Sequence, residues 1–268
     1  MRKIGLEELK KIQLDILREV AKFCDKNDIR YYLCGGTLLG AIRHKGYIPW
    51  DDDIDIAIPR KDYEKFIKLF NDENRNLYVI SCEVNNKYPS VFAKVYNTKI
   101  ILVEYTNMPY ENHCVNIDIF PIDNMSDNIK LYKRQYQMIQ FYRNICILKA
   151  IKSKKGRIFY KEIILFLGRN IFKFISFNKL ARKINQIAQK YNSDETDFVA
   201  RTGSQYKMRL PRSIFDEQIE VEFEKEHFKA PVGYHEYLTI LYGDYMKLPP
   251  IDKQKTHHNF EAYWKDDN

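Results

Sequence analysis

The chain has 268 residues, a formal net charge of +8, and 45% hydrophobic and 30% charged residues. This composition is typical of a globular protein and excludes disorder as its main state. The longest stretch without a charge, 31–42, holds 12 residues, whereas a membrane-spanning helix needs about 20. Because charged residues also precede any apolar run at the start of the chain, we expect neither a transmembrane span nor a secretory signal, and hence a cytoplasmic protein.

Helical and alternating spacings of apolar residues follow one another along the chain. They predict, in chain order, a helix over 6–28, a strand over 30–34, a helix over 37–44, a strand over 53–58, a helix over 61–70, strands over 77–82, 91–96, 100–105 and 115–122, helical structure over 127–191, a strand over 219–223 and a helix over 234–242. Thr37 is interpreted as the N-cap of its helix, Pro121 as the end of its strand, and Asp123 as a turn or cap residue.

Interleaved helices and strands of this kind predict an α/β (α+β) fold, with a mixed sheet flanked by helices and a separate helical lobe. We expect a catalytic core over 1–125, a basic helical lobe over 126–200, and a C-terminal segment over 201–268 that folds back on the core. The five cysteines are widely spaced without a CxxC pair, which indicates reduced thiols and argues against a disulfide framework or a zinc site.

Basic residues are concentrated in one segment of the chain. Between Arg143 and Lys190 there are 13 Lys or Arg and one acid, Glu162, a local charge of +12. This block indicates an anionic partner. Because it carries no nucleic-acid-binding motif and mixes Ile and Phe with Lys, we expect peripheral contact with an anionic membrane at its inner face. The alternative is that these rings pack inside the lobe and the lysines are simply solvated.

The strongest chemical signal is the run WDDDIDIAI over residues 50–58. Alternate side chains of a strand share a face, so Asp53 and Asp55 point one way while Ile54 and its neighbours point to the core. Asp51 joins the acidic face if the extended geometry reaches back that far. Clustered carboxylates repel one another unless a cation lies among them, and oxygen ligands suit Mg²⁺ or Mn²⁺ better than zinc. The alternative is an acidic strand end that faces water.

A second strand repeats this arrangement, because Asn116 and Asp118 share one face opposite Val115, Ile117 and Ile119. Alone this is a weak signal, but beside the first cluster Asp118 can supply the remaining carboxylate of a metal-dependent phosphoryl-transfer site. Lys94 lies on another expected strand and is interpreted as a solvated lysine, with pairing to phosphate as the alternative.

Glycines precede the helix expected over 37–44. Backbone amides at such a helix start can hold phosphate oxygens, and glycine permits close approach. Gly35, Gly36 and Thr37 are therefore candidates for phosphate contact, although a diglycine turn alone gives the same pattern. The cationic group that follows, Arg43-His44-Lys45, suits phosphates but also suits a solvated helix end.

Three stretches, GGTLLGAIRHKGYIPWDDDID over 35–55, DIFP over 118–121 and YGDYMKLPP over 242–250, together resemble the LicD/fukutin family. The first resembles the family signature, the second its second acidic motif, and the third the ending of bacterial LicD-type phosphorylcholine transferases. The resemblance covers nearly the whole chain in order, although 127–200 carries no matching motif. It implies a nucleotidyltransferase-like fold and a transferase that moves an alcohol phosphate from a CDP-alcohol to a glycan.

The resemblance also implies roles for individual residues. Asp51, Asp53, Asp55 and Asp118 would be metal ligands, with Mg²⁺ or Mn²⁺ bridging the diphosphate of CDP-choline. Asp53, Asp55 and Asp118 form the catalytic set, and Asp118 is our preferred base for the attacking hydroxyl. A quaternary ammonium needs aromatic faces, for which Tyr47 and Trp50 are candidates. The equal alternative is that Tyr47 and Trp50 are both packing residues that hold the loop in place.

The leading hypothesis is therefore phosphocholine transfer from CDP-choline to a lipid-linked, cell-surface glycan precursor, such as a teichoic acid or lipo-oligosaccharide, with release of CMP. The same chemistry with CDP-ribitol or CDP-glycerol, or nucleotidyl transfer to another acceptor, is the alternative. An inactive glycan- or membrane-binding module is the non-enzymatic alternative, and the four metal-suited carboxylates argue against it.

Overall fold

The computed structural model of the protein describes residues 1–73, 76–104, 114–151, 159–203, 208–256 and 260–265. The described helices are α1 (Leu6–Lys26), α2 (Gly35–His44), α3 (Arg60–Glu73), α4 (Ile129–Ala150), α5 (Phe159–Ile171), α6 (Phe177–Ala188) and α7 (Tyr234–Tyr242). The strands are β1 (Lys3–Ile4), β2 (Tyr32–Leu33), β3 (Asp55–Pro59), β4 (Leu77–Ile80), β5 (Ala93–Asn97), β6 (Ile100–Glu104), β7 (Asn116–Met125), β8 (Phe198–Arg201), β9 (Leu210–Pro211), β10 (Gln218–Phe223), β11 (Glu226–Pro231) and β12 (Phe260–Trp264). The helices expected over 6–28, 61–70 and 234–242 are thereby confirmed.

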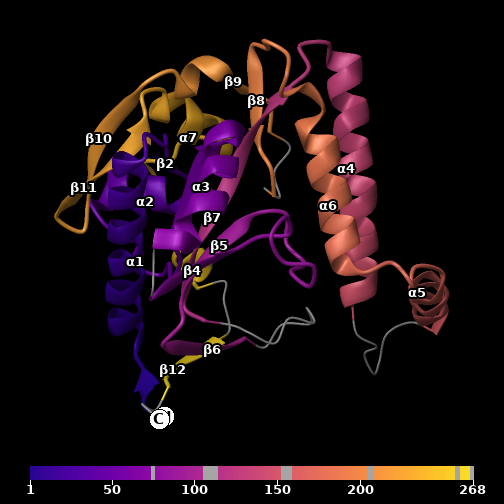
Figure 1. The fold of residues 1–268 in the computed structure, drawn as a ribbon, viewed down its shortest axis with the longest axis horizontal. Helices are drawn as coiled ribbons and strands as arrows, with labels where there is room; N and C mark the ends of the chain where they lie inside the picture. Colours follow the sequence, from indigo (N-terminus) through magenta and orange to yellow (C-terminus); the bar gives the residue numbers. More distant parts are fainter. Residues whose placement is uncertain (74–75, 105–113, 152–158, 204–207, 257–259, 266–268) are drawn as a thin grey trace.

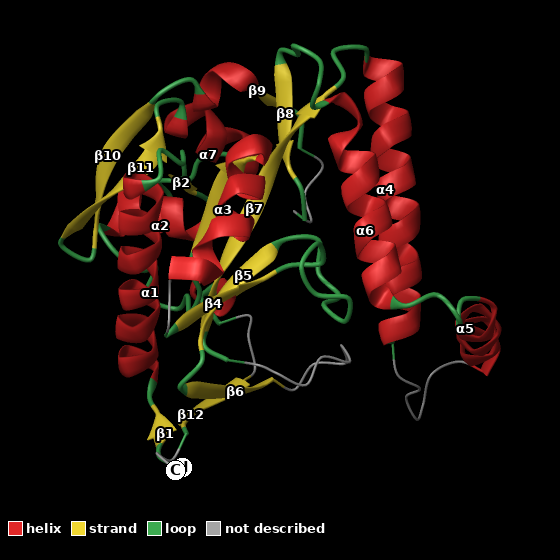
Figure 2. Ribbon diagram, in the orientation of Figure 1, coloured by secondary structure: helices red, strands yellow, loops and turns green. Residues whose placement is uncertain are grey.

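A mixed sheet with the strand order β2-β3-β7-β5-β4 forms the centre of the molecule, and β8 and β9 extend it beside β7 (Figure 1). The β3–β7 pair is parallel, and the other pairs are antiparallel. Helices α1 and α3 lie side by side in front of this sheet (Figure 2), where Phe23 of α1 packs edge-on against Phe66 and Phe70 of α3. The predicted α/β fold with a mixed sheet and flanking helices is confirmed.

The alternation predicted for the two acidic strands is also confirmed. Ile54, Ile56 and Ile58 are fully buried, and Val115, Ile117 and Ile119 are buried in the same core cluster. The first strand is shorter than predicted, because the ladder to β7 begins only at Asp55, opposite Asp118. Asp51 to Asp53 thus precede the strand and form a loop before it.

Strand β7 is longer than predicted, and Pro121 does not end it. Up to Ile119 the strand pairs with β5, and from Ile122 it pairs with β8. Pro121 falls at this change of partner, where its missing N–H interrupts neither ladder. The interpretation of Asp123 as a turn or cap residue is therefore wrong: it lies inside β7 and is fully buried.

The basic part of the chain forms a group of helices beside the sheet, with α4 and α6 packed together and α5 at the periphery (Figure 1). Residues 152–158 of the predicted membrane-contact segment lie outside the described part. The chain then returns to the core, where β8 pairs with β7 and β12 pairs with β1 and β6. We keep the division at 125 and 200 as a proposal. Of the described helices, none is both long and apolar enough to cross a bilayer.

Candidate active site

The parallel pairing of β3 with β7 brings the two acidic motifs together. Asp55 and Asp118 are direct partners in this register, and the amide of Asp118 donates a hydrogen bond of 2.9 Å to the carbonyl of Ile54. Their side chains are both partly buried. Two carboxylates 63 residues apart in sequence thus share one end of the sheet.

The loop before β3 adds three more carboxylates. Asp51, Asp52 and Asp53 each place a carboxylate oxygen within 4.8 Å of the other two. Asp52, which the sequence analysis did not select, is the most buried of the three; its Oδ2 accepts a hydrogen bond of 2.7 Å from Thr256. The signal for it was its place in the middle of three consecutive aspartates.

Burial and neighbouring negative charges both act on the pKa values of carboxylates in this cluster. Burial raises the pKa of Asp51 above its ordinary value, and the charges of Asp55 and Asp52 add to that rise. Burial and then the charge of Asp53 raise the pKa of Asp55 well above its ordinary value, although Arg201 opposes the shift. A divalent cation relieves such repulsion, and an all-oxygen donor set fits Mg²⁺ or Mn²⁺.

The diglycine places the start of α2 directly against these carboxylates. Gly35 has a φ of +57°, and a Cβ there would lie 2.9 Å from Oδ2 of Asp55. A Cβ on Gly36 would lie 2.6 Å from Oδ2 of Asp51. Only glycine permits this approach, which brings backbone amides of a helix start beside the metal-suited cluster.

The interpretation of Thr37 as the N-cap is wrong, because Cys34 occupies that position. The hydroxyl of Thr37 instead accepts a hydrogen bond of 2.8 Å from the amide of Asp55. Because the hydroxyl bonds the backbone of β3, it connects the first turn of α2 to the strand. Thr37 thereby helps to place Asp55.

Among the described residues, Lys94 and Arg201 pair with the carboxylates, and both come from strands other than β3 and β7. The ammonium of Lys94 on β5 lies 2.9 Å from Oδ1 of Asp118 and donates to Asn116 at 3.0 Å. Its interpretation as a solvated lysine is therefore wrong, since register places it opposite Asp118. Arg201 on β8 lies 3.5 Å from Oδ2 of Asp55. No sequence motif surrounds Arg201, so spacing offered no signal for it.

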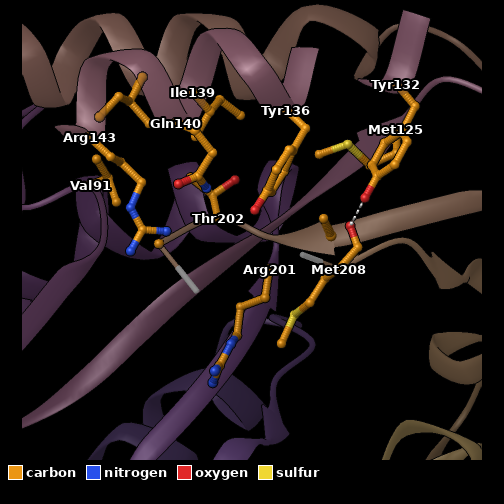
Figure 3. Close-up of a pocket in the computed structure, with 13 residues that line it drawn as sticks. Val91, Met125, Tyr132, Tyr136, Ile139, Gln140, Arg143, Arg201, Thr202 and Met208 are labelled. Carbon is orange, nitrogen blue, oxygen red and sulfur yellow. Dashed lines mark hydrogen bonds between the residues drawn. The ribbon is translucent and has the colours of Figure 1, made fainter. Parts of the chain in front are cut away.

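Arg201 also reaches two other parts of the site. Its guanidinium donates to the sulfur of Cys34 at 2.9 Å and lies over the ring of Phe120, 4.4 Å from the centroid. The residue borders a mostly apolar cleft between the sheet and helices α4 and α6, into which Tyr136 and Arg143 point, while the Arg201 side chain itself extends away from these two (Figure 3). Arg201 therefore connects the carboxylate site with the helical part of the chain.

The cationic group after α2 faces a different part of the molecule. Arg43 donates to the carbonyl of Tyr245 at 2.8 Å and to Nε2 of His44 at 2.9 Å, and burial lowers the pKa of both side chains. Lys45 is exposed and ends the helix with a φ of +60°. Arg43 is thus directed toward the segment 242–250, whereas the ring of His44 lies edge-on to Trp50, with centroids 6.4 Å apart.

The two aromatic candidates lie in different surroundings. The hydroxyl of Tyr47 donates to the carbonyl of Lys10 at 3.0 Å, and its ring packs against Phe223 with centroids 5.0 Å apart. These contacts are those of a packing residue. Trp50 instead lines a cavity of about 530 Å³ together with Tyr242 and Tyr245.

Comparison with known proteins gives the family. The family profile described as LicD/FKTN/FKRP, nucleotidyltransferase domain, matches residues 28–149, which include both acidic motifs. The chain is 32% identical to the lipopolysaccharide cholinephosphotransferase LicD of Haemophilus influenzae, over 98% of this chain and 99% of that protein. It is also 31% identical to the ribitol 5-phosphate transferase FKRP of Mus musculus, over 40% of this chain and 20% of that protein. Since a relative of this similarity spans nearly the whole chain, the protein belongs to the LicD/FKTN/FKRP family and is a phosphotransferase.

Proposed function

We propose that this phosphotransferase moves phosphocholine from CDP-choline to a hydroxyl of a lipid-linked cell-surface glycan precursor and releases CMP. The observation that carries the proposal is the cluster of carboxylates beside the first residues of α2. Its members are Asp51, Asp52, Asp53, Asp55 and Asp118. Similarity along nearly the full length to a protein named as a cholinephosphotransferase supports choline over ribitol or glycerol.

The donor set suits one role for a divalent cation. We propose that Asp51, Asp53, Asp55 and Asp118 hold Mg²⁺ or Mn²⁺, with Asp52 beside them. Such an ion would offset the negative charge that develops on the leaving CMP. The amide of Gly36 and the hydroxyl of Thr37 lie at the same helix start, where phosphate oxygens are favoured. The amide of Gly35 donates a hydrogen bond of 3.3 Å to the hydroxyl of Tyr237, which phosphate binding there would replace.

The proposed reaction exchanges one phosphorus–oxygen bond for another. The acceptor hydroxyl oxygen bonds to the phosphorus that carries choline, while the bond from that phosphorus to the bridging oxygen breaks and CMP leaves. One carboxylate of Asp53, Asp55 and Asp118 accepts the hydroxyl proton. Lys94 and Arg201 hold Asp118 and Asp55 in place through their ion pairs.

The cavity beside Trp50 supports recognition of the choline head group. Trp50 directly precedes Asp51, and Tyr242 and Tyr245 line the same cavity. Aromatic faces attract a quaternary ammonium through their π electrons. We therefore propose Trp50 as a head-group contact. The packing contacts of Tyr47 argue for a supporting role for that residue.

Product analysis tests the function directly. The purified protein, Mg²⁺, a glycan acceptor and CDP-choline should yield CMP and an acceptor that gains the mass of phosphocholine. CDP-ribitol and CDP-glycerol are the competing donors, and faster transfer from either would replace choline as the head group. An acceptor that gains CMP would instead establish nucleotidyl transfer.

Substitution of Trp50 tests the head-group contact. Trp50→Leu should raise KM for CDP-choline about tenfold, because a cation–π contact in a desolvated site contributes roughly 1–2 kcal/mol. Trp264→Leu is the matched control, since this second tryptophan lies on β12 and bonds Glu8. Equal KM values for the two variants would remove Trp50 from the head-group site.

A further inference from the structure

Helix α5 presents an apolar stripe to solvent. Its side chains recur at the i, i+3 and i+4 spacing of one helix face, and Phe166 is 61% and Ile171 71% exposed. In the turn that follows, Phe174 is 88% exposed. The other exposed members of the stripe are Tyr160, Ile163 and Leu167.

The opposite face of α5 is held by α4, so the stripe cannot turn inward without loss of these contacts. A Cβ on Gly168 would lie 2.7 Å from the side chain of Leu148 on α4, which shows how closely the two helices approach. Arg169 donates to the carbonyl of Ile151 at 3.0 Å, and Lys149 donates to that of Phe172 at 2.9 Å. These contacts fix the rotation of α5 with its apolar face outward.

The free energy of the system falls when the exposed apolar face of an amphipathic helix leaves water. In Figure 1, α5 lies at the edge of the molecule, away from the central sheet. A flat surface can therefore reach it without displacing the elements that carry the carboxylates. The identity of that surface follows from charge.

The segment 143–190, which includes α5, carries a charge of +12, and Lys173 and Lys179 beside the stripe are exposed. A second copy of the chain on this face would bring two such segments together, and their like charges would repel. An anionic lipid surface offers both the apolar interior that the rings require and the charge that the lysines attract.

We propose that α5 and the turn through Phe174 dock on an anionic membrane surface, with the stripe inserted at the interface and the lysines among the head groups. The helix lies in the plane of the surface and does not span it. This docking is independent of the donor and the reaction proposed above, since it uses neither the carboxylates nor the Trp50 cavity.

Vesicle co-sedimentation of the full chain tests the docking. The vesicles are equimolar phosphatidylglycerol and phosphatidylcholine, with pure phosphatidylcholine for comparison. The wild type should bind the anionic vesicles and lose binding at high salt. Phe166→Gln/Phe174→Gln should lower the affinity at least about tenfold, because two rings leave the interface. Leu6→Gln/Ile251→Gln is the matched control, with parent side chains that are 46% and 84% exposed far from α5 in sequence.

Charge is tested in the same way. Lys173→Gln/Lys179→Gln should lower the affinity about 30-fold, at about 1 kcal/mol for each lysine. Lys11→Gln/Lys68→Gln removes the same charge from exposed sites on α1 and α3 and should leave the affinity unchanged. All variants must keep the wild-type circular dichroism spectrum and melting temperature. Equal binding by the α5 variants and their controls would overturn the proposal. A concentration-dependent dimer in lipid-free buffer that Phe166→Gln/Phe174→Gln dissociates would overturn it in favour of a second copy.

Discussion

Among the clustered carboxylates, Asp53 gives the cleanest test of the proposed metal site. Asp55 forms an ion pair with buried Arg201, so its substitution also disturbs a structural contact. Asp53 adds charge that raises the pKa of Asp55, and its hydrogen bond to Asp51 can be kept by an asparagine of the same shape. Asp53→Asn should lower turnover about 100-fold or more through loss of a ligand charge. Its melting temperature should stay the same or rise, because like-charge repulsion is relieved.

Steady-state rates and thermal melts measure both effects. Asp15→Asn, which changes an exposed aspartate on α1, is the control and should keep wild-type turnover. Near-normal turnover by folded Asp53→Asn would contradict the proposed catalytic set.

At Gly40, stability depends on the absence of a side chain. A Cβ there would lie 2.4 Å from the carbonyl oxygen of Gly46 and 3.3 Å from the amide of Ile48, both rigid backbone atoms. Gly40→Ala should therefore destabilise the protein by about 1–3 kcal/mol, although alanine favours helices. Gly5→Ala, with nothing within 4 Å of the new Cβ, should cost less than about 1 kcal/mol, because alanine is a poorer N-cap for α1 than glycine. Urea unfolding compares the stability of the two variants. Equal midpoints would show that the backbone of the loop after α2 shifts to accommodate the new Cβ at little cost.

At the scale of elements, a buried ion pair joins α3 to the centre of the sheet. Arg60 donates two hydrogen bonds of 2.7 Å to the carboxylate of Asp123 on β7. Asp123 also accepts from Asn192 at 2.7 Å and from the hydroxyl of Thr202. One carboxylate thus connects α3, β7 and the segments on either side of β8.

Removal of one partner leaves the other charge buried without its opposite charge. Arg60→Met should cost about 3–5 kcal/mol of unfolding free energy, and Arg60→Met/Asp123→Leu should recover part of that loss. The pair of Arg30 and Asp62, in which the arginine side chain is 55% exposed, provides the control: Arg30→Met should cost at most about 1 kcal/mol. Denaturant titration of the four proteins measures the difference, and an equal cost for Arg60→Met and Arg30→Met would show that the buried pair carries no special weight.

At the scale of the whole molecule, ligand binding should stabilise the fold through the carboxylate site. With Mg²⁺ and CDP-choline at 100 times the dissociation constant, mass action adds about 2.7 kcal/mol to the stability. Exhaustive chelation with EDTA should abolish both this gain and turnover, and added Mg²⁺ or Mn²⁺ should restore them. Differential scanning fluorimetry on the wild type and Asp53→Asn measures the gain, which the variant should lose. Activity that survives exhaustive chelation would refute metal dependence.

Local pattern in the sequence determined the parts of the site that are close along the chain. Strict alternation separates Ile54, Ile56 and Ile58 from Asp55, because strand geometry assigns alternate residues to opposite faces. The same reasoning correctly predicted that Ile117 and Ile119 are buried beside Asp118. Local pattern misjudged Thr37 and Pro121, since each is governed by a neighbouring strand that local spacing does not reveal.

Only the tertiary structure decided which charges meet. The register between β5 and β7 places Lys94 beside Asp118. Because the chain returns to the sheet at β8, Arg201 pairs with Asp55, which lies 146 residues earlier. The same return surrounded Asp123 with partners that make its burial favourable. Such contacts depend on strand order, which short-range periodicity does not encode. The sequence by itself thus determined the family and the alternation of buried and acidic residues on the two strands, whereas the fold decided the cationic partners of the carboxylates and the outward face of α5.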